Sequence, residues 1–253
     1  MLRCSDAASL GRVAAWYPQP TALVQAPLQG LHGSVWVDDV QQPHVALLCC
    51  GDLLYPAGDV RHLTMGVFLD EMRPLLKPGR LLIPPDAAWQ AALQPILPQS
   101  ARAITCYALR TGRWKAAALE GLAQVPEGYA LQPLQGGWVA QARQADWCQD
   151  WVSQYPTDED YAQRGLGWCV LHDGRLAAGA SSYVSCPGYL EIQVDTHPDE
   201  RGRGLATAAS AALILDCLRQ GIHPGWDAAN LTSRHIAHKL GYVDAGSYLA
   251  WLM

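Results

Sequence analysis

The sequence lacks a long uninterrupted hydrophobic run and is poor in charge. Hydrophobic residues make up 50% of the 253 residues and charged residues 16%, which is typical of chains that fold around extensive cores. No segment approaches the roughly 20 consecutive apolar residues that a membrane helix needs. The first twenty residues also lack the apolar core of a secretory signal. These absences predict a cytoplasmic protein with no membrane partner, and the length accommodates two domains.

Paired cysteine motifs are missing as well. None of the eight cysteines stands in a CxxC spacing, the pattern on which zinc-binding and redox motifs depend. Most of them lie in apolar surroundings, where a free thiol behaves as a small hydrophobe. The sequence therefore predicts neither a disulfide framework nor a metal site.

A basic excess, which nucleic-acid-binding domains usually carry, is absent too. The formal net charge is −5. Residues 1–125 hold 10 Lys and Arg against 9 Asp and Glu, whereas residues 126–253 hold 8 against 14. This balance disfavours a nucleic-acid partner, and the acidic second half favours a cationic small substrate.

A segment rich in Pro, Gly and Gln, residues 119–137, separates two differently patterned parts of the chain. We place the boundary near residue 125, which gives an N-terminal α/β domain over 1–125 and a second domain over 126–253. Apolar runs and helical spacing predict short elements in the first domain. The predicted strands are 33–39, 44–52, 79–85 and 102–110, and the predicted helices are 64–76 and 86–97. No chemical motif stands out there.

The second domain has a clearer order of elements. Residues 165–185 predict a β-hairpin with Asp173-Gly174 as its turn, because tight hairpin turns favour residues that tolerate positive φ. A strand over 189–196 precedes an Ala-rich helix over about 204–220, which ends at Gly221. The remaining elements are a short strand over 223–228, a helix over 230–240 and a last strand over 247–253. The predicted fold class is α/β, with helices packed on a sheet.

Two glycines and two arginines occupy the junction between the strand that ends at Thr196 and the long helix, as Arg201-Gly202-Arg203-Gly204. A helix N-terminus leaves N–H groups unpaired and carries partial positive charge, so it favours an anion. Glycine allows close approach or positive φ, and arginine adds donors. The stretch predicts a pyrophosphate-binding turn, with an ordinary charged turn as the alternative. It is neither a Walker loop nor a dinucleotide fingerprint, which needs a third glycine.

Asparagine is almost absent, and the single one, Asn230, stands at a predicted helix start. That position is typical of an N-cap, and it also suits contact with a ligand. The two interpretations are compatible.

These two stretches together resemble the acetyl-CoA site of the GNAT superfamily of N-acetyltransferases. The pattern Gln/Arg-x-x-Gly-x-Gly/Ala matches residues 201–206, and the pattern of an Asn and a helix ending Lys-x-Gly-Phe matches residues 230–242. Within the superfamily, EIQVDT, RGRGLATAAS and GIHPGWDAANLTSRHIAHKLGY look like the zwittermicin-A-resistance group. The resemblance covers about residues 164–253. It implies a GNAT fold there, a mixed and mostly antiparallel sheet flanked by helices, and leaves open a degenerate GNAT-like copy before it.

The resemblance implies an acyltransferase that moves an acetyl group from acetyl-CoA to a primary amine of a small molecule in a ternary complex. An antibiotic or another amino compound is the expected acceptor. The implied cofactor-binding residues are Val194, Asp195, Thr196, Arg201, Gly202, Arg203, Gly204, Leu205, Ala206, Thr207, Asn230 and Ser233. Trp226 and Asp227 are candidate substrate contacts. No metal is implied, and a homodimer is left open.

Acetyl transfer to an amine needs a base for the amine proton and stabilisation of the carbonyl oxygen. Glu191 is the first candidate for the base, because the family often places a Glu before the cofactor-binding end of this strand. A carboxylate in a partly apolar cleft has a raised pKa and can accept a proton near neutrality. Asp195 is the second candidate, and a solvent-facing strand residue is the alternative for Glu191.

One family position departs from the pattern. Many members carry a Tyr seven residues after the Asn as general acid to the thiolate, and this chain has Ala237 there. Ser233, Tyr242 and Tyr248 are candidate proton donors, or the thiolate leaves unaided. The same departure motivates an alternative function, a non-catalytic acyl-CoA-binding sensor or partner-binding module.

Overall fold

The computed structural model describes every residue from Met1 to Met253, and its contacts divide the chain into two compact units. The first unit contains Met1–Cys106 and Ser247–Met253, and the second contains Tyr107–Gly246. The expected boundary near residue 125 therefore falls inside the second unit. The division comes earlier because the second half of β6 (Arg102–Thr111) pairs with β12 (Asp227–Ala228). The domains 1–125 and 126–253 stay a prediction.

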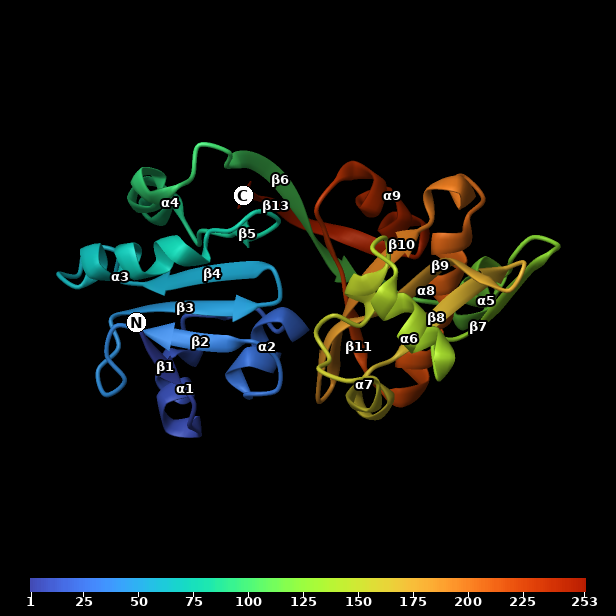
Figure 1. Ribbon diagram of the computed structural model, residues 1–253, viewed down its shortest axis with the longest axis horizontal. Coiled ribbons are helices and arrows are strands. Elements are labelled where there is room, and N and C mark those ends of the chain that lie inside the picture. The colour runs from blue at the N-terminus through green and yellow to red at the C-terminus, as the bar shows by residue number, and fades with distance from the viewer. The chain divides into compact units, whose positions relative to one another are not determined.

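The first unit is built on a sheet of short strands in the order β1-β2-β3-β4-β5-β13, of which β2, β3 and β4 are drawn side by side in blue in Figure 1. Neighbours are antiparallel except β4 and β5, which are parallel. The strands are β1 (Leu2–Cys4), β2 (Ser34–Val37), β3 (Val45–Cys50), β4 (Leu53–Gly58), β5 (Leu81–Leu82) and the end of β13 (Tyr242–Leu252). The helices are α1 (Ala7–Ala14), α2 (Ala22–Leu28), α3 (Met65–Met72) and α4 (Ala87–Leu93). The central strand β3 is buried along nearly its whole length.

The predicted elements of this unit are confirmed within a few residues, whereas two strands (β1 and β4) and two helices (α1 and α2) were missed. Helices α3 and α4 each pass into a 3-10 turn, Arg73–Leu75 and Gln94–Ile96, because the proline in each turn cannot continue an α-helix. Of the two missed strands, β4 contains Pro56 opposite Leu47 of β3. Proline lacks the N–H of a strand residue and argues against a strand in a sequence pattern.

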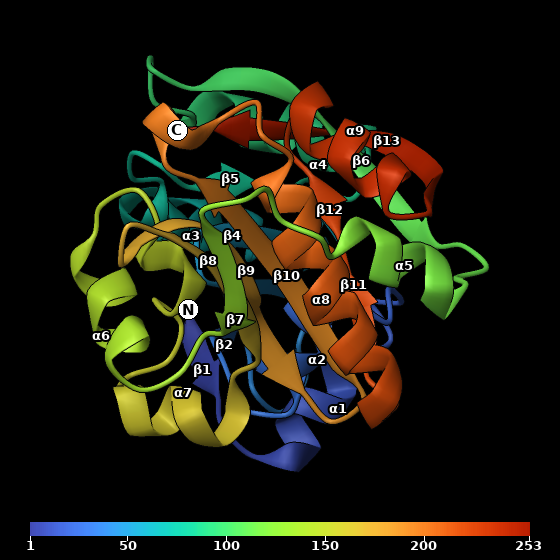
Figure 2. The ribbon, with the colours of Figure 1, turned by 90° about the vertical axis from the view of Figure 1, so that its right-hand side faces the viewer.

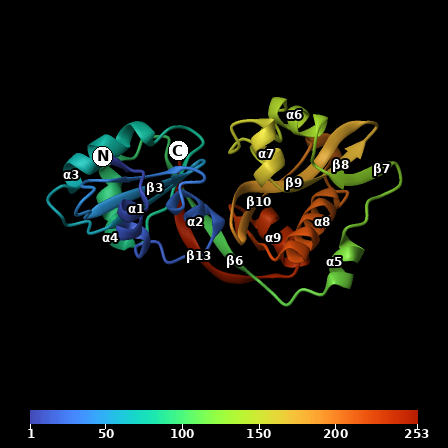
Figure 3. The same cartoon turned by 90° about the horizontal axis from the view of Figure 1, so that it is seen from below.

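The second unit contains a five-stranded sheet in the order β11-β10-β9-β8-β7, antiparallel except for the pair β10 and β11. Helix α8 runs along this sheet in Figure 2, and Figure 3 shows α6 and α7 on the opposite face. The strands are β7 (Tyr129–Pro133), β8 (Gly167–His172), β9 (Arg175–Cys186), β10 (Tyr189–Thr196) and β11 (His223–Gly225). The helices are α5 (Ala116–Leu122), α6 (Gly137–Gln144), α7 (Asp158–Arg164), α8 (Leu205–Gln220) and α9 (Leu231–Lys239).

Small side chains allow α8 to pack closely on the sheet. Leu205, Ala209 and Leu213 of the helix share a core cluster with Ala180 and Ile192 of the strands. The other face of β10 carries polar residues, because side chains alternate along a strand. The sheet thus separates the packed side of β10 from the side that presents Glu191, Gln193 and Asp195.

The order of elements predicted for the second domain is confirmed. The hairpin turn has positive φ at both Asp173 (48°) and Gly174 (70°), and α8 ends at Gly221 with a φ of 68°. One predicted strand is wrong as a single element, because residues 223–228 form β11 and β12, which pair with β10 and β6 respectively. The last strand also begins earlier than predicted, at Tyr242.

The predicted fold class is confirmed as α/β, with mixed and mostly antiparallel sheets flanked by helices in each unit. No helix combines the length and the apolar character that a bilayer span requires.

Candidate active site

A cavity of about 800 Å³ lies in the second unit, where the end of β10, the start of α8 and one side of α9 meet. All the residues that the sequence predicts to contact acetyl-CoA line it, from Val194–Thr196 and Arg201–Thr207 to Asn230 and Ser233. Trp147, Glu200, Thr232, Ile236 and Lys239 complete the lining. The fold therefore gathers two stretches that are about 30 residues apart in the sequence around one space.

The glycine turn is required by backbone conformation. Gly202 and Gly204 have φ values of 79° and 78°, in the left-handed region that glycine adopts without strain. A Cβ at either residue would meet no atom within 4 Å. Glycine is therefore not needed at these positions to let another part of the protein pack closely. The space beside both residues is open.

The N-terminus of α8 has no side-chain cap. By contrast, the Asn230 side chain caps α9, because its Oδ1 accepts the N–H of Ser233 at 2.9 Å. An uncapped start leaves the first helical N–H groups without a side-chain acceptor, and the helix dipole adds positive potential there. The start of α8 is therefore suited to an anionic ligand.

Three cationic residues line the same cavity as this start: Arg201, Arg203 and Lys239. Arg203 forms an ion pair of 3.3 Å with Glu200. Glu200 also accepts hydrogen bonds of 2.6 Å from the Tyr129 hydroxyl and from Nδ1 of His172, and these bonds lower its pKa. The ionised Glu200 carboxylate thus holds the Arg203 side chain at the cavity. The uncapped helix, the open glycine turn and these cations fit the diphosphate of acetyl-CoA.

Asp195 brings a carboxylate to the cavity wall. Its Oδ2 accepts hydrogen bonds from Nε1 of Trp151 at 3.1 Å and from Nε2 of Gln193 at 3.0 Å. Burial raises the pKa of Asp195 in spite of these two bonds. A carboxylate of raised pKa in a cavity can accept a proton.

Glu191 is almost fully buried, with 5% of its surface exposed, and does not line the cavity. Its Oε1 accepts the N–H of Asp227 at 3.0 Å, whereas its Oε2 has no partner. A Cβ at Gly225 would lie 2.4 Å from that oxygen, so glycine leaves the room that the carboxylate occupies. Burial, followed by the charge of Asp227, raises the pKa of Glu191 well above its ordinary value.

Among the three candidate proton donors, Ser233 lines the cavity. Its Oγ accepts a hydrogen bond of 3.0 Å from Nε1 of Trp226, so its own hydroxyl hydrogen is left to donate. Tyr242 is 3% exposed, donates its hydroxyl hydrogen to the Pro224 carbonyl at 3.0 Å, and has a pKa raised by burial. Tyr248 belongs to the first unit.

Several predicted site residues lie outside the cavity lining. Trp226 packs in the core with 3% of its surface exposed, and Asp227 approaches Glu191 through its N–H. Ala237, at the family's tyrosine position, is fully buried. A side chain at position 237 therefore packs in the core beneath α9 and does not line the cavity.

Sequence reasoning missed five lining residues. Ile236 and Lys239 follow Ser233 in steps of three, and Thr232 precedes Ile236 by four, so this face of α9 could have been predicted from helical spacing. Trp147 lies in an irregular segment and packs edge-on against Trp151 and His197. No pattern in the sequence marks Trp147.

The cap of α9 gives a prediction that separates stability from function. Asn230→Ala should lower the free energy of unfolding by about 1 kcal/mol, because an N-cap is lost. Thr157→Ala is the matched control, since Thr157 caps α7 through the N–H of Asp160 at 3.1 Å and lies outside the cavity. Urea denaturation should give similar losses for both, and titration with coenzyme A should show weaker binding for the Asn230 variant alone. Equal coenzyme affinity in the two variants would contradict a ligand contact for Asn230.

Comparison with known proteins agrees with this geometry. The family model described as GNAT acetyltransferase matches residues 15–251. A Bacillus subtilis protein described as an uncharacterized N-acetyltransferase, YdfB, is 25% identical over 243 residues, which cover 90% of this chain and 88% of that protein. The crystal structure of a GCN5-related N-acetyltransferase-like protein from Streptococcus suis has a TM-score of 0.87 and 32% identity, and the match covers 98% of this chain and 99% of that one.

A more distant structure shares the fold alone. It is described as a tandem GNAT protein from the clavulanic acid biosynthesis pathway, has 17% identity and a TM-score of 0.57, and matches 99% of this chain and 96% of its own. The family match spans both units, which form a tandem GNAT-like arrangement. The chain therefore belongs to the GNAT acetyltransferase family and is an acyltransferase.

Proposed function

We propose that this protein transfers the acetyl group of acetyl-CoA to a primary amine of a small molecule by direct attack in a ternary complex. The observation that carries the proposal is the cavity at the uncapped start of α8, with its open glycine turn and three cations. Acetyl-CoA, when bound, supplies the activated acyl group. The cytoplasmic location and the homodimer stay predictions.

The acceptor that we propose is cationic before the reaction, such as an antibiotic amine or another amino compound. Residues 126–253 are acidic overall, and Glu191 and Asp195 place two carboxylates on the polar face of β10. Resemblance to the zwittermicin-A-resistance group supports an antibiotic as acceptor. Acetylation removes the positive charge of such an amine.

Different residues accept the amine proton and stabilise the departing sulfur. We assign the base to Glu191, whose raised pKa and partner-free oxygen suit proton uptake. Because Glu191 lies outside the cavity lining, the amine proton reaches it through water. Asp195 is the second candidate because it lines the cavity. Ser233 donates a hydrogen bond toward the departing sulfur, and Trp226 orients the Ser233 oxygen. A backbone N–H in the segment Val194–Thr196 polarises the carbonyl.

A thiol-release assay tests this function against the sensor alternative. The full chain is mixed with acetyl-CoA and a panel of cationic amines, with the matching alcohols as controls, and free coenzyme A is measured. We expect turnover with at least one amine and none with its alcohol. Coenzyme binding without turnover on any amine, unchanged in Glu191→Gln, would favour the non-catalytic acyl-CoA sensor.

A further inference from the structure

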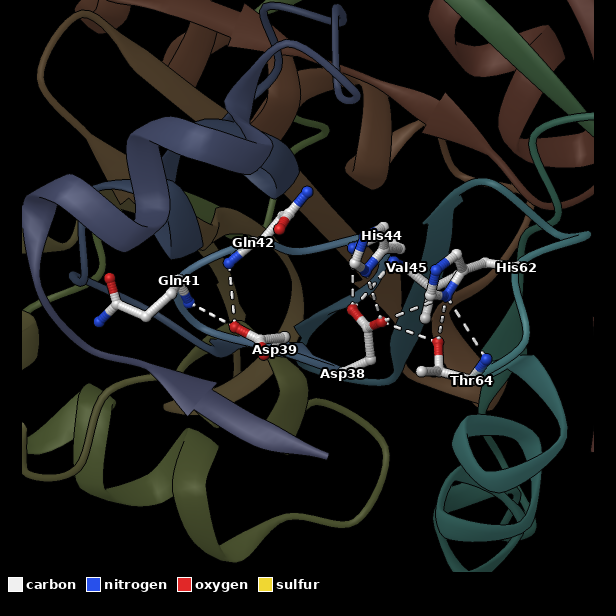
Figure 4. A network of polar contacts seen from close by, with 8 residues as sticks. All are labelled: Asp38, Asp39, Gln41, Gln42, His44, Val45, His62 and Thr64. Atoms are coloured by element: carbon white, nitrogen blue, oxygen red, sulfur yellow. Dashed lines mark hydrogen bonds and ion pairs between the residues drawn. The ribbon is translucent and has the colours of Figure 1, made fainter.

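Three side chains with metal-binding chemistry meet in the first unit, far from the glycine turn in sequence. They are Asp38 after β2, His44 before β3 and His62 between β4 and α3. Their potential ligand atoms all lie within 4.8 Å of one another. Figure 4 shows both imidazole rings beside the Asp38 carboxylate, with Thr64 next to them.

The Asp38 carboxylate is held in one orientation. Its Oδ1 accepts the backbone N–H groups of His44 at 2.9 Å and of Val45 at 3.1 Å. Its Oδ2 is left beside the imidazoles and accepts the Thr64 hydroxyl at 2.7 Å. The cluster therefore contains an oriented carboxylate whose side chain is only 4% exposed.

Nδ1 of each histidine lies near the same carboxylate oxygen, although the closer partner of His62 Nδ1 is the Thr64 hydroxyl oxygen at 2.9 Å. The distances from Oδ2 are 3.2 Å to Nδ1 of His44 and 3.9 Å to Nδ1 of His62. Ligand atoms around a tetrahedral ion at zinc-ligand distances stand about 3.4 Å apart, so the separations of these three atoms are close to those that an ion requires. The side chains of His44 and His62 remain 31% and 24% exposed, which gives an ion access from solvent.

The two rings are stacked, with centroids 3.7 Å apart and planes inclined by 3°. An ion bound in the plane of one ring would lie out of the plane of its parallel neighbour. Binding therefore requires rotation of one imidazole about its Cβ–Cγ bond. We expect the His62 ring to rotate and to exchange its 2.9 Å contact with the Thr64 hydroxyl for the ion, while the His44 ring keeps its Nδ1 3.2 Å from Asp38 Oδ2.

We propose that Asp38, His44 and His62 bind a divalent transition-metal ion such as Zn²⁺. Two imidazole nitrogens and one carboxylate oxygen form a ligand set that these ions favour. The Thr64 hydroxyl remains a donor to the carboxylate and orients it, as outer partners do at metal sites. His44 also lines a cavity of about 490 Å³, so water from that cavity takes the fourth position. The bound ion links the β2–β3 turn to the segment before α3.

Titration of the full chain with Zn²⁺, in competition with a chromogenic chelator, tests the site. His62→Gln removes one ligand without disturbing the hydrogen bonds of the β2–β3 turn, whereas a change at Asp38 would remove them. Asp39→Asn is the matched control, because Asp39 is the adjacent carboxylate and binds only the N–H groups of Gln41 and Gln42. We expect one ion per chain, affinity reduced about tenfold or more in the His62 variant, and unchanged affinity in the Asp39 variant.

Two further readouts identify the ligands. Zn²⁺ should raise the Tm of the wild type and of Asp39→Asn, and leave that of His62→Gln unchanged. Co²⁺ in place of Zn²⁺ should give an absorption spectrum without thiolate bands, since the site contains no cysteine. Equal Zn²⁺ affinity in wild type and His62→Gln, an equal loss in Asp39→Asn, or a thiolate spectrum would overturn the proposal.

Discussion

Replacing Gly204 by glutamate should abolish coenzyme A binding and leave the fold nearly intact. Gly204 has a φ of 78° at the uncapped start of α8, and open space lies where its side chain would project. A carboxylate there would meet the diphosphate, and two like charges 4 Å apart repel by about 4 kcal/mol near a protein surface. We therefore expect a loss of affinity of about 1,000-fold, measured by calorimetric titration with coenzyme A.

Gly204→Ala is the control for the backbone. Alanine has the same difficulty with positive φ, which costs about 1–2 kcal/mol, but adds no charge and meets no atom. It should lower the Tm as much as glutamate does and reduce coenzyme affinity far less. If Gly204→Glu kept its affinity, or if both variants lost it equally, the diphosphate would not lie at this turn.

Glu191→Gln should lower kcat by about 100-fold to 10,000-fold, the range that a positioned general base contributes. The variant keeps an oxygen for the N–H of Asp227, so the hydrogen bond of 3.0 Å can persist. The KM for acetyl-CoA should change little, because Glu191 lies outside the cavity lining. Steady-state kinetics with an accepted amine give both quantities.

The pH dependence identifies the base. A carboxylate accepts a proton only when ionised, and burial raises the pKa of Glu191 well above its ordinary value. The wild-type rate should therefore rise with pH through that raised pKa, and this dependence should be missing from Glu191→Gln. Asp195→Asn should keep the dependence and most of the rate. If Asp195→Asn lost the rate and Glu191→Gln did not, Asp195 would be the base.

The raised pKa of Glu191 also makes the stability of Glu191→Gln relative to wild type depend on pH. A buried acid whose pKa is raised in the folded state contributes full stability below its unfolded pKa and loses it as pH rises through the folded pKa. The difference in Tm between Glu191→Gln and wild type should therefore move in favour of the variant as the pH rises. Low activity of the variant at high pH would then not reflect unfolding.

Local features explain why much of the coenzyme cavity could be predicted from the sequence. The Asp173-Gly174 turn, the strand ending at Thr196, the paired glycines before α8 and the single asparagine each depend on neighbours within a few residues. The resemblance to the GNAT superfamily then predicted that the paired glycines and the asparagine lie close together in the fold. Gly202 and Gly204 both have positive φ, and the presence of glycine at these positions in the sequence already indicates such a backbone conformation.

Long-range placement explains what could not be predicted. Nothing near Trp147 in the sequence indicates that it reaches the cavity. The cluster of Asp38, His44 and His62 was missed because its members come from three segments, and no spacing links His62 to the other two. Strand β13 was predicted too short for a related reason, since its first half extends beyond the apolar run that marks its second half.

The path of the chain through β13 affects the order in which the molecule can be completed on the ribosome. Trp251 and Leu252 pair with β5, and Trp251 and Met253 lie in the same core cluster as Phe68 and Trp89. The first unit thus lacks its final strand until residues 247–253 have been translated. A fragment limited to residues 1–125 would expose the edge of β5 and leave that core unfilled, so the early part of the nascent chain has to wait for a segment made more than a hundred residues later.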